Sequence, residues 1–261
     1  MTSLRDFATD AHPLRASSIP YLLKCSWRHV MIALGLLEDH SGKAADTGSA
    51  VHAAVHAWHL TSHNGPAAVD AMRALAPAKF PLADCDEAAR LLAFYAEDER
   101  NQEATVVLLE QSVQVTLPPT DDDPTGQPIV ISGTLDQVRE ERGVLSLWDI
   151  KTGSMHRGLE MVHEHALQLA VYQLGAARVL GRPVARAGVI RIRDYPARIP
   201  QPVFWAAPWT LDQLPLLLDA VREQVARIRR GIVAAGPGSH CSWCPAGGLN
   251  SCLSIMKEKL A

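Results

Sequence analysis

The sequence lacks several features that define specialised classes of protein. No apolar run reaches the roughly 18 residues that a membrane-spanning helix needs. The N-terminal stretch has no apolar segment of the kind found in secretory signal peptides, and we therefore expect a cytosolic protein. No G-x-x-x-x-G-K-[ST] phosphate-binding loop occurs, so this chain carries no nucleotide-driven motor of its own.

The chain also has no excess of positive charge and contains few cysteines. The net charge of −3 excludes a protein that coats nucleic acid with a uniformly basic surface, so a polyanion would have to bind at a local patch. Only five cysteines occur in 261 residues, and a reducing cytosol disfavours their use as disulfides. The remaining composition, with 48% hydrophobic and 20% charged residues, is typical of a globular protein with a buried core.

The hydrophobic pattern predicts helices first and strands later. Helical periodicity covers about the first 103 residues, in segments 17–38, 47–65, 67–76 and 85–101. β-branched, near-alternating segments then follow at 104–117, 129–140 and 143–151, and the last two form a hairpin through a short turn. A helix over 159–181, strands over 184–194 and 201–207, and a helix over 210–233 complete the pattern. This order predicts an α/β fold with a mixed sheet flanked by helices.

The segment W-D-I-K-T-G-S places two opposite charges on one face of a strand, because residues i and i+2 point the same way. Asp149 and Lys151 could form a solvated ion pair, which is the usual meaning of such a pattern. Asp136 lies on the preceding strand and would meet Asp149 across the hairpin. Two carboxylates and a lysine are what metal-assisted phosphodiester hydrolysis requires.

Other residues strengthen or extend this interpretation. Gln168 and Tyr172 are spaced i, i+4 and share a helix face, where they could contact nucleic acid or simply face solvent. His52 lies on the second helix and could ligate Mn²⁺, or could be an ordinary core or surface histidine. Glu110, on the strand before Asp136, is equally suited to be a ligand for metal or water and to be an exposed strand residue.

Four short motifs occur in a fixed order: G-S-A-V-H, G-T-L-D, D-I-K-T-G and Q-L-A-V-Y. In this order they resemble the PD-(D/E)XK nucleases, above all the RecB and AddB nuclease domains and the iron–sulfur nucleases of CRISPR adaptation. The resemblance extends from about residue 17 to residue 252. It implies a single restriction-endonuclease-like domain over residues 1–261, active as a divalent-metal-dependent DNA nuclease, more often an exonuclease. The setting would be DNA recombination, repair or phage DNA processing in a bacterial or phage-infected cell.

The resemblance also implies roles for individual residues. A Mg²⁺ or Mn²⁺ ion would bind the side chains of His52, Asp136 and Asp149 and the backbone carbonyl of Ile150. Lys151 would be the catalytic lysine, while Gln168 and Tyr172 would help to place the DNA strand. One departure is Leu135, which stands where the family has a proline before its first catalytic acid.

The cysteines suggest a second metal site. Cys241 and Cys244 form a C-x-x-C motif, with Cys252 eight residues further on, and a fourth ligand could come from Cys25 or Cys85. Four thiolates suit either zinc or a 4Fe–4S cluster. The resemblance implies the cluster, with Cys25 as the fourth ligand, so that a C-terminal segment of about 238–252 is joined to the helical N-terminal part.

The predicted partner is DNA, as linear or single-stranded ends, with a helicase or recombination protein as a further possible partner. A local positive groove could form from arginines of two segments: Arg178, Arg182, Arg186, Arg191, Arg193, Arg222, Arg227, Arg229 and Arg230. A non-enzymatic alternative is a metal-stapled DNA-binding or scaffold module with an inactive site. Serine β-lactamases share K-T-G, but their upstream S-x-x-K is absent, and H-E-H at 163–165 is not the zincin motif.

Overall fold

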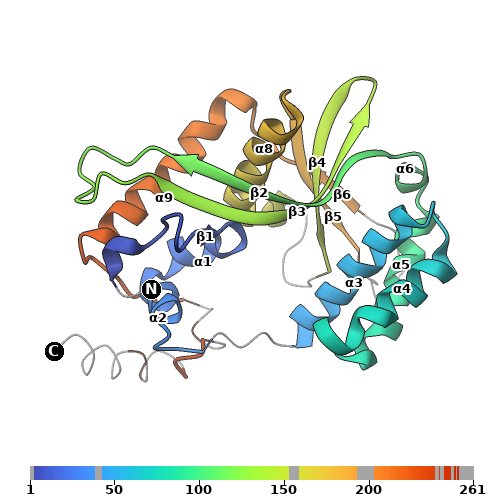
Figure 1. Cartoon of the computed structure of the whole chain (residues 1–261), viewed down its shortest axis with the longest axis horizontal. Coiled ribbons are helices and arrows are strands. Elements are labelled where there is room, and N and C mark those ends of the chain that lie inside the picture. The colour runs from blue at the N-terminus through green and yellow to red at the C-terminus, as the bar shows by residue number, and fades with distance from the viewer. Residues whose placement is uncertain are drawn as a thin grey trace. The chain divides into compact units, whose positions relative to one another are not determined.

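The computed structural model describes residues 3–38, 43–152, 159–192 and 203–238, together with residues 241, 244–247, 250 and 252. The chain divides into two compact units, each assembled from separate segments. The first unit comprises Met1–His40, Gln114–Gly133 and Asp212–Ala261, and the second comprises Ser41–Val113 and Thr134–Leu211. Two long strands, β2 (Thr105–Leu117) and β3 (Ile129–Glu141), contribute residues to both units (Figure 1).

A mixed sheet forms the centre of the second unit, as the sequence predicts. β3 is antiparallel to β4 (Val144–Lys151), which is parallel to β5 (Arg186–Arg191), and β5 is antiparallel to β6 (Val203–Ala206). β2 pairs with β3 on its other side. The predicted hairpin is confirmed: Arg142 and Gly143 at its turn both have positive φ, which suits the right-handed twist of the strands.

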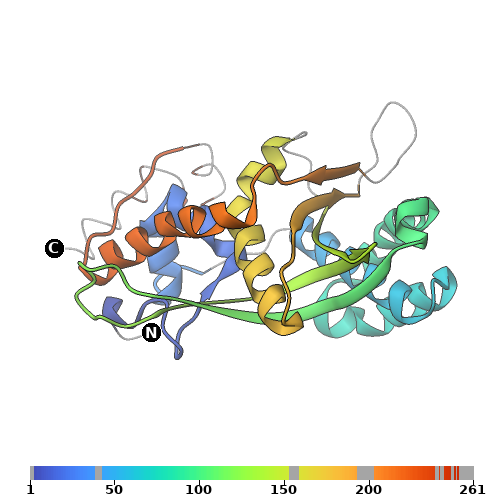
Figure 2. The same ribbon diagram turned by 90° about the horizontal axis from the view of Figure 1, so that it is seen from above.

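Helices of the second unit cover one face of this sheet. α3 (Lys43–Leu60), α4 (Gly65–Lys79) and α5 (Cys85–Glu97) pack together, and a short α6 (Glu99–Gln102) follows them (Figures 1 and 2). Their buried side chains share a core with Ile150, Ile190 and Ile192. Because side chains alternate along a strand, Asp149 and Lys151 lie on the face of β4 opposite to Ile150.

The helix predicted over 159–181 is divided in two. α7 (Leu159–Glu164) ends before His165, whose φ of −97° and ψ of 8° interrupt the helix, and α8 (Ala166–Leu180) begins after it. α8 packs on β4 and β5 and ends, as predicted, at Gly181 with a left-handed φ of 67°. The break at His165 turns its side chain toward the next turn of α8.

The first unit is mainly helical. α1 (Ile19–Lys24), α2 (Ser26–Ala33) and α9 (Leu214–Arg229) are its α-helices among the described residues, and the 3₁₀ turns η1 (Leu4–Asp6) and η2 (Ala16–Ser18) precede α1. A short strand that the sequence analysis did not predict, β1 (Leu14–Arg15), pairs in parallel with the start of β3. The helix predicted over 17–38 is interrupted at Cys25, which adopts φ −156° and ψ 89°.

A close approach of two distant segments explains this interruption. The hydroxyl of Ser26 accepts a hydrogen bond from the backbone N–H of Ala234, whose carbonyl accepts from the N–H of Trp27. A side chain at Gly236 would overlap the carbonyl oxygen of Lys24, so only glycine fits there. The turn at Cys25 is therefore held against the segment that leads to the C-terminal cysteines.

None of the helices in the described part of the chain is both long and apolar enough to cross a membrane.

Candidate functional site

The candidate site of the second unit begins where the β3–β4 ladder ends. The pairing of the two strands extends from Glu141 opposite Val144 to Gln137 opposite Trp148. At the next position, the Asp136 carboxylate accepts a 2.5 Å hydrogen bond from the backbone N–H of Ile150. The Asp136 side chain thus accepts the hydrogen bond that a backbone carbonyl would accept in a continued ladder, and its carboxylate is held beside β4.

His52 of α3 links three groups of this site. Its Nε2 lies 3.0 Å from the Ile150 carbonyl oxygen, and its Nδ1 lies 3.0 Å from Asp136 Oδ1 and 3.7 Å from Glu110 Oε1. Burial by itself would lower the pKa of His52, but the Asp136 charge and the hydrogen bonds to Asp136 and Glu110 raise it to about 10. In the metal-free protein the imidazole ring is therefore a cation at neutral pH.

Glu110 reaches the same point through an unusual backbone conformation. Its φ of 47° is in the left-handed region, which costs an L-residue roughly 1–3 kcal/mol in the middle of a strand. The regular alternation of burial in β2 begins only after this position, at Ser112. With this backbone conformation, the Glu110 side chain departs from the regular alternation of side chains along β2, and its carboxylate lies near His52.

The three side chains fit a divalent metal ion. Among the described residues, only His52, Glu110 and Asp136 form a group of three or more candidate ligands whose atoms all lie within 4.8 Å of one another. Two carboxylates and one imidazole are ligands that Mn²⁺ accepts readily, and the carboxylates also suit Mg²⁺. Three of the predicted site residues are thus brought together.

Asp149 and Lys151 form the second part of the site. Asp149 is 2% exposed, and its Oδ2 lies 2.6 Å from Lys151 Nζ. Burial raises the pKa of Asp149 more than Lys151 lowers it, and the nearby charge of Asp136 raises it further. Burial also acts to raise the pKa of Asp136, but the charge of His52 and the hydrogen bonds that Asp136 accepts lower it overall. The pKa values of Asp136 and Asp149 are thus shifted in opposite directions, a pattern typical of acid–base sites.

The Q-x-x-x-Y pair of α8 contacts Asp149 directly. The Gln168 side-chain amide donates a 3.3 Å hydrogen bond to Asp149 Oδ1 and lies 3.3 Å from the Tyr172 hydroxyl. Both side chains are buried, and burial together with the Asp149 charge raises the pKa of Tyr172. The helix pair predicted from spacing therefore belongs to the acidic site. His165, to which the sequence analysis gave no role, contacts Gln168.

The four cysteines of the predicted second metal site lie within the first unit. Burial raises the pKa of the Cys252 thiol, and the charges of Cys25, Cys244 and Cys241 raise it further. Mutual influence of this kind requires the thiols to be neighbours. Cys85, the other candidate for a fourth ligand, belongs to α5 of the second unit.

The arginines of the predicted positive groove have different environments. Arg229 is buried, pairs with Asp123 at 2.6 Å and donates to backbone carbonyls including that of Phe7, so it is a structural residue. Arg222 pairs with Asp219, and Arg182 pairs with Glu140. Three of these arginines are exposed: Arg178, Arg186 and Arg227. Arg191 is buried beside Lys151 on the next strand, and Arg193 lies outside the described residues.

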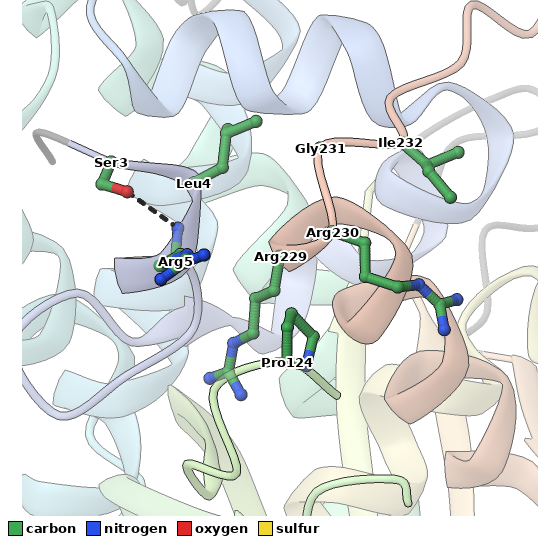
Figure 3. A pocket seen from close by; sticks show the side chains of 8 residues that line it. All are labelled: Ser3, Leu4, Arg5, Pro124, Arg229, Arg230, Gly231 and Ile232. Carbon is green, nitrogen blue, oxygen red and sulfur yellow. Dashed lines mark hydrogen bonds between the residues drawn. The ribbon is translucent and has the colours of Figure 1, made fainter. Parts of the chain in front are cut away.

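A pocket of about 700 Å³ in the first unit includes the end of α9. Its cationic side chains are Arg5, Arg229 and Arg230, and Figure 3 shows them around Pro124. Arg229 is committed to Asp123, and Arg230 is paired with Asp122. Two of its three cations are thus paired with carboxylates, and Arg229 and Arg230 are the members of the predicted groove that line it.

Comparisons with known proteins identify the family of this chain. A family model described as the PD-(D/E)XK nuclease superfamily matches residues 13–249. Among solved structures, one with the description "Putative exonuclease", from Eubacterium rectale, is 17% identical, with a TM-score of 0.57 and coverage of 90% of this chain and 88% of that one. The structure of SSO0001 is 14% identical, with a TM-score of 0.38 and coverage of 85% and 92%. No curated protein matches.

The match covers the helices, the sheet and all the residues of the acidic site, and the mixed α/β architecture is that of the restriction-endonuclease-like fold. The resemblance of the four ordered motifs to the PD-(D/E)XK nucleases is thereby confirmed at the level of the superfamily. The chain belongs to the PD-(D/E)XK nuclease superfamily.

Proposed function

We propose that this protein is a divalent-metal-dependent deoxyribonuclease that acts as an exonuclease on DNA ends. One observation carries the proposal: His52, Glu110 and Asp136 converge within 4.8 Å, and the Asp149–Lys151 pair lies on the adjoining strand of the same unit. The family supports a nucleic-acid substrate, and the match of Gln168 and Tyr172 to the Q-x-x-x-Y motif supports the proposal that this substrate is DNA. The description of the Eubacterium rectale protein supports the choice of an exonuclease.

The side chains of the site have complementary roles. His52, Glu110 and Asp136 would hold Mg²⁺ or Mn²⁺, with Asp149 and the Ile150 carbonyl as further ligands. When bound, such an ion supplies polarisation of the scissile phosphate and lowers the pKa of a water molecule beside it. Lys151 orients the attacking water and offsets the negative charge that develops on the phosphate. The resemblance gives Gln168 and Tyr172 a role in placing the DNA strand; both side chains are buried, and Gln168 contacts Asp149.

We further propose that Cys25, Cys241, Cys244 and Cys252 hold a 4Fe–4S cluster that stabilises the first unit. The resemblance assigns one cysteine before the nuclease motifs and three after them to such a cluster, and Cys25, Cys241, Cys244 and Cys252 follow that order. All four belong to the first unit. A single structural zinc ion is the alternative, because four thiolates suit either group.

A catalytically inactive, metal-stapled DNA-binding module is the second candidate. No residue of the acid–acid–lysine set is missing, which favours the enzyme. The typical settings of such a nuclease are recombination, repair and phage DNA processing, where a helicase or recombination protein would supply DNA ends.

The test is digestion of linear DNA with Mg²⁺ or Mn²⁺ by the wild type, Lys151→Ala and Lys79→Ala. Lys79 is an exposed lysine at the end of α4 and serves as the matched control. We expect the wild type and Lys79→Ala to digest the DNA equally and Lys151→Ala to lose on the order of 100- to 10,000-fold in rate. Equal digestion by Lys151→Ala would refute the catalytic assignment, and a wild type that binds DNA without cutting it would favour the scaffold.

A further inference from the structure

The side chain of His165 lies at the start of a chain of contacts that leads into the acidic site. His165 Nδ1 is 3.2 Å from Gln168 Oε1, and the Gln168 amide nitrogen is 3.3 Å from Asp149 Oδ1. Asp149 in turn contacts Lys151. Gln168 is 4% exposed, so solvent offers its amide few other partners.

The chemistry of these groups fixes the direction of the hydrogen bonds. A carboxylate only accepts, so the Gln168 amide nitrogen must face Asp149, and Oε1 must face His165. An amide oxygen also only accepts, so His165 Nδ1 must carry a proton and donate it. If the amide turned over, Oε1 would face the Asp149 carboxylate, and two electronegative oxygens would oppose each other.

The local structure is consistent with a role for His165 other than ending a helix. It occupies the position just before α8, where serine, threonine, aspartate and asparagine are preferred because they accept from backbone N–H groups. The His165 side chain makes no such capping bond. Its ring instead contacts Gln168, one turn along the helix.

We propose that His165 is a positioning residue of the nuclease site: it locks the orientation of the Gln168 amide and thereby holds the Asp149 carboxylate beside Lys151. This inference deepens the proposed function, because it assigns a supporting partner to a proposed catalytic carboxylate. Side chains that orient the groups of a metal site typically influence activity or metal affinity by 10- to 100-fold.

The experiment compares three variants of the full chain. His165→Asn retains a donor near the position of Nδ1, His165→Leu is similar in size without a donor, and His163→Leu changes an exposed histidine two residues away. We expect kcat for DNA digestion to fall about 10- to 100-fold in His165→Leu, with KM for DNA changed less than about twofold. His165→Asn should stay within about threefold of the wild type, and His163→Leu should match it.

A second measurement does not depend on nuclease activity. Thermal unfolding is compared for His165→Leu in the wild-type background and in a Gln168→Leu background. We expect His165→Leu to lower Tm by about 2 to 4 °C in the first background and by much less in the second, because the bond it removes is already absent there. This difference tests the contact even if the proposed nuclease function fails.

Each outcome decides the matter. Loss of kcat in His165→Leu, recovery in His165→Asn and coupled Tm values support the positioning role. An active His165→Leu, or a His165→Asn as impaired as His165→Leu, overturns it, as do equal Tm losses in both backgrounds. A wild type without nuclease activity overturns the proposed function alone, and the Tm coupling then decides whether His165 positions Gln168.

Discussion

The carboxylate of Asp136 takes the place of a backbone partner for Ile150 on the neighbouring strand, through a 2.5 Å hydrogen bond to its N–H. The carbonyl of the same Ile150 lies 3.0 Å from His52 Nε2. One peptide segment of β4 is therefore held by two side chains that also face the candidate metal site. Asp136 and His52 therefore contribute both to the stability of the fold and to the candidate metal site. A substitution separates these two contributions only if it removes one and keeps the other.

Asp136→Asn should separate them. Asparagine keeps an oxygen that accepts from the Ile150 N–H, so the metal-free fold loses only the charge that stabilises protonated His52. The lost charge should lower Mn²⁺ affinity at least about tenfold and abolish digestion of DNA. Asp136→Ala also leaves the N–H without its acceptor and should cost about 1–3 kcal/mol more, measured by urea unfolding. Equal stability of the two variants would contradict the structural half of this role.

Metal binding should release a proton from His52. Its pKa of about 10 keeps the ring charged at pH 7.5 in the metal-free protein, while a metal ligand must be neutral. We therefore expect Mn²⁺ affinity to rise with pH up to about 10, and titration calorimetry in buffers of different ionisation enthalpy to detect the released proton. His52→Asn should release about one proton fewer. Affinity that is independent of pH would exclude this exchange.

The same pKa shift predicts how the stability of the metal-free protein depends on pH. A raised pKa means that the folded state binds the proton more tightly than the unfolded state. The contribution of His52 is complete below the ordinary value of 6.5 and is lost as the pH rises through about 10. Denaturant unfolding of the wild type and His52→Asn across this range measures the difference, which should shrink as the pH increases.

Arg229 should be essential for the first unit, whereas Arg227 should not. Arg229→Ala leaves Asp123 buried without its partner and should cost about 3–5 kcal/mol in unfolding free energy. Arg227 is exposed on the same helix, and Arg227→Ala should stay within about 0.5 kcal/mol of the wild type. The hydrogen bonds of Asp123 and the charge of Arg229 lower the pKa of Asp123 despite its burial. The Asp123–Arg229 pair therefore stabilises the folded protein fully at pH values above the ordinary pKa of 3.8, and this contribution is lost as the pH falls through the lowered pKa. Equal losses in both variants would contradict the assignment.

Cys241→Ala should remove the proposed cluster, and Cys85→Ala should not. A crosslink from Cys25 to Cys241 closes a loop of more than two hundred residues and could stabilise the fold by about 5 kcal/mol. We expect Cys241→Ala to be colourless and poorly soluble after anaerobic purification. Cys85→Ala should keep the brown colour and visible absorbance of the wild type. A zinc content of one per chain in colourless wild type would replace the cluster with zinc.

The sequence predicts the strands well and identifies the site motifs, because both depend on local sequence pattern. Alternation along β4 predicts that Asp149 and Lys151 share a face, and the hairpin predicts that Asp136 is near. The break at Cys25 is different: the surrounding residues favour a continuous helix, and the backbone next to the break contacts the distant residue Ala234.

Burial of charge was also invisible in the sequence. Arg229 stands among other arginines on a helix that looks solvent-exposed, and its partner Asp123 is distant along the chain. Glu110 looked as much like a surface residue as a ligand, because the left-handed φ that turns its carboxylate inward leaves no local pattern. Both cases depend on tertiary structure, which periodicity does not report.

The backbone of Glu110 has a consequence for how this protein can diverge. At a φ of 47°, glycine or asparagine would be the easier choice, and glutamate persists only while its carboxylate is useful. A duplicated copy that lost its metal would be free to relax this position and would become more stable by doing so. In a descendant of this chain, glycine or asparagine at position 110 would then indicate that the metal site had lost its function.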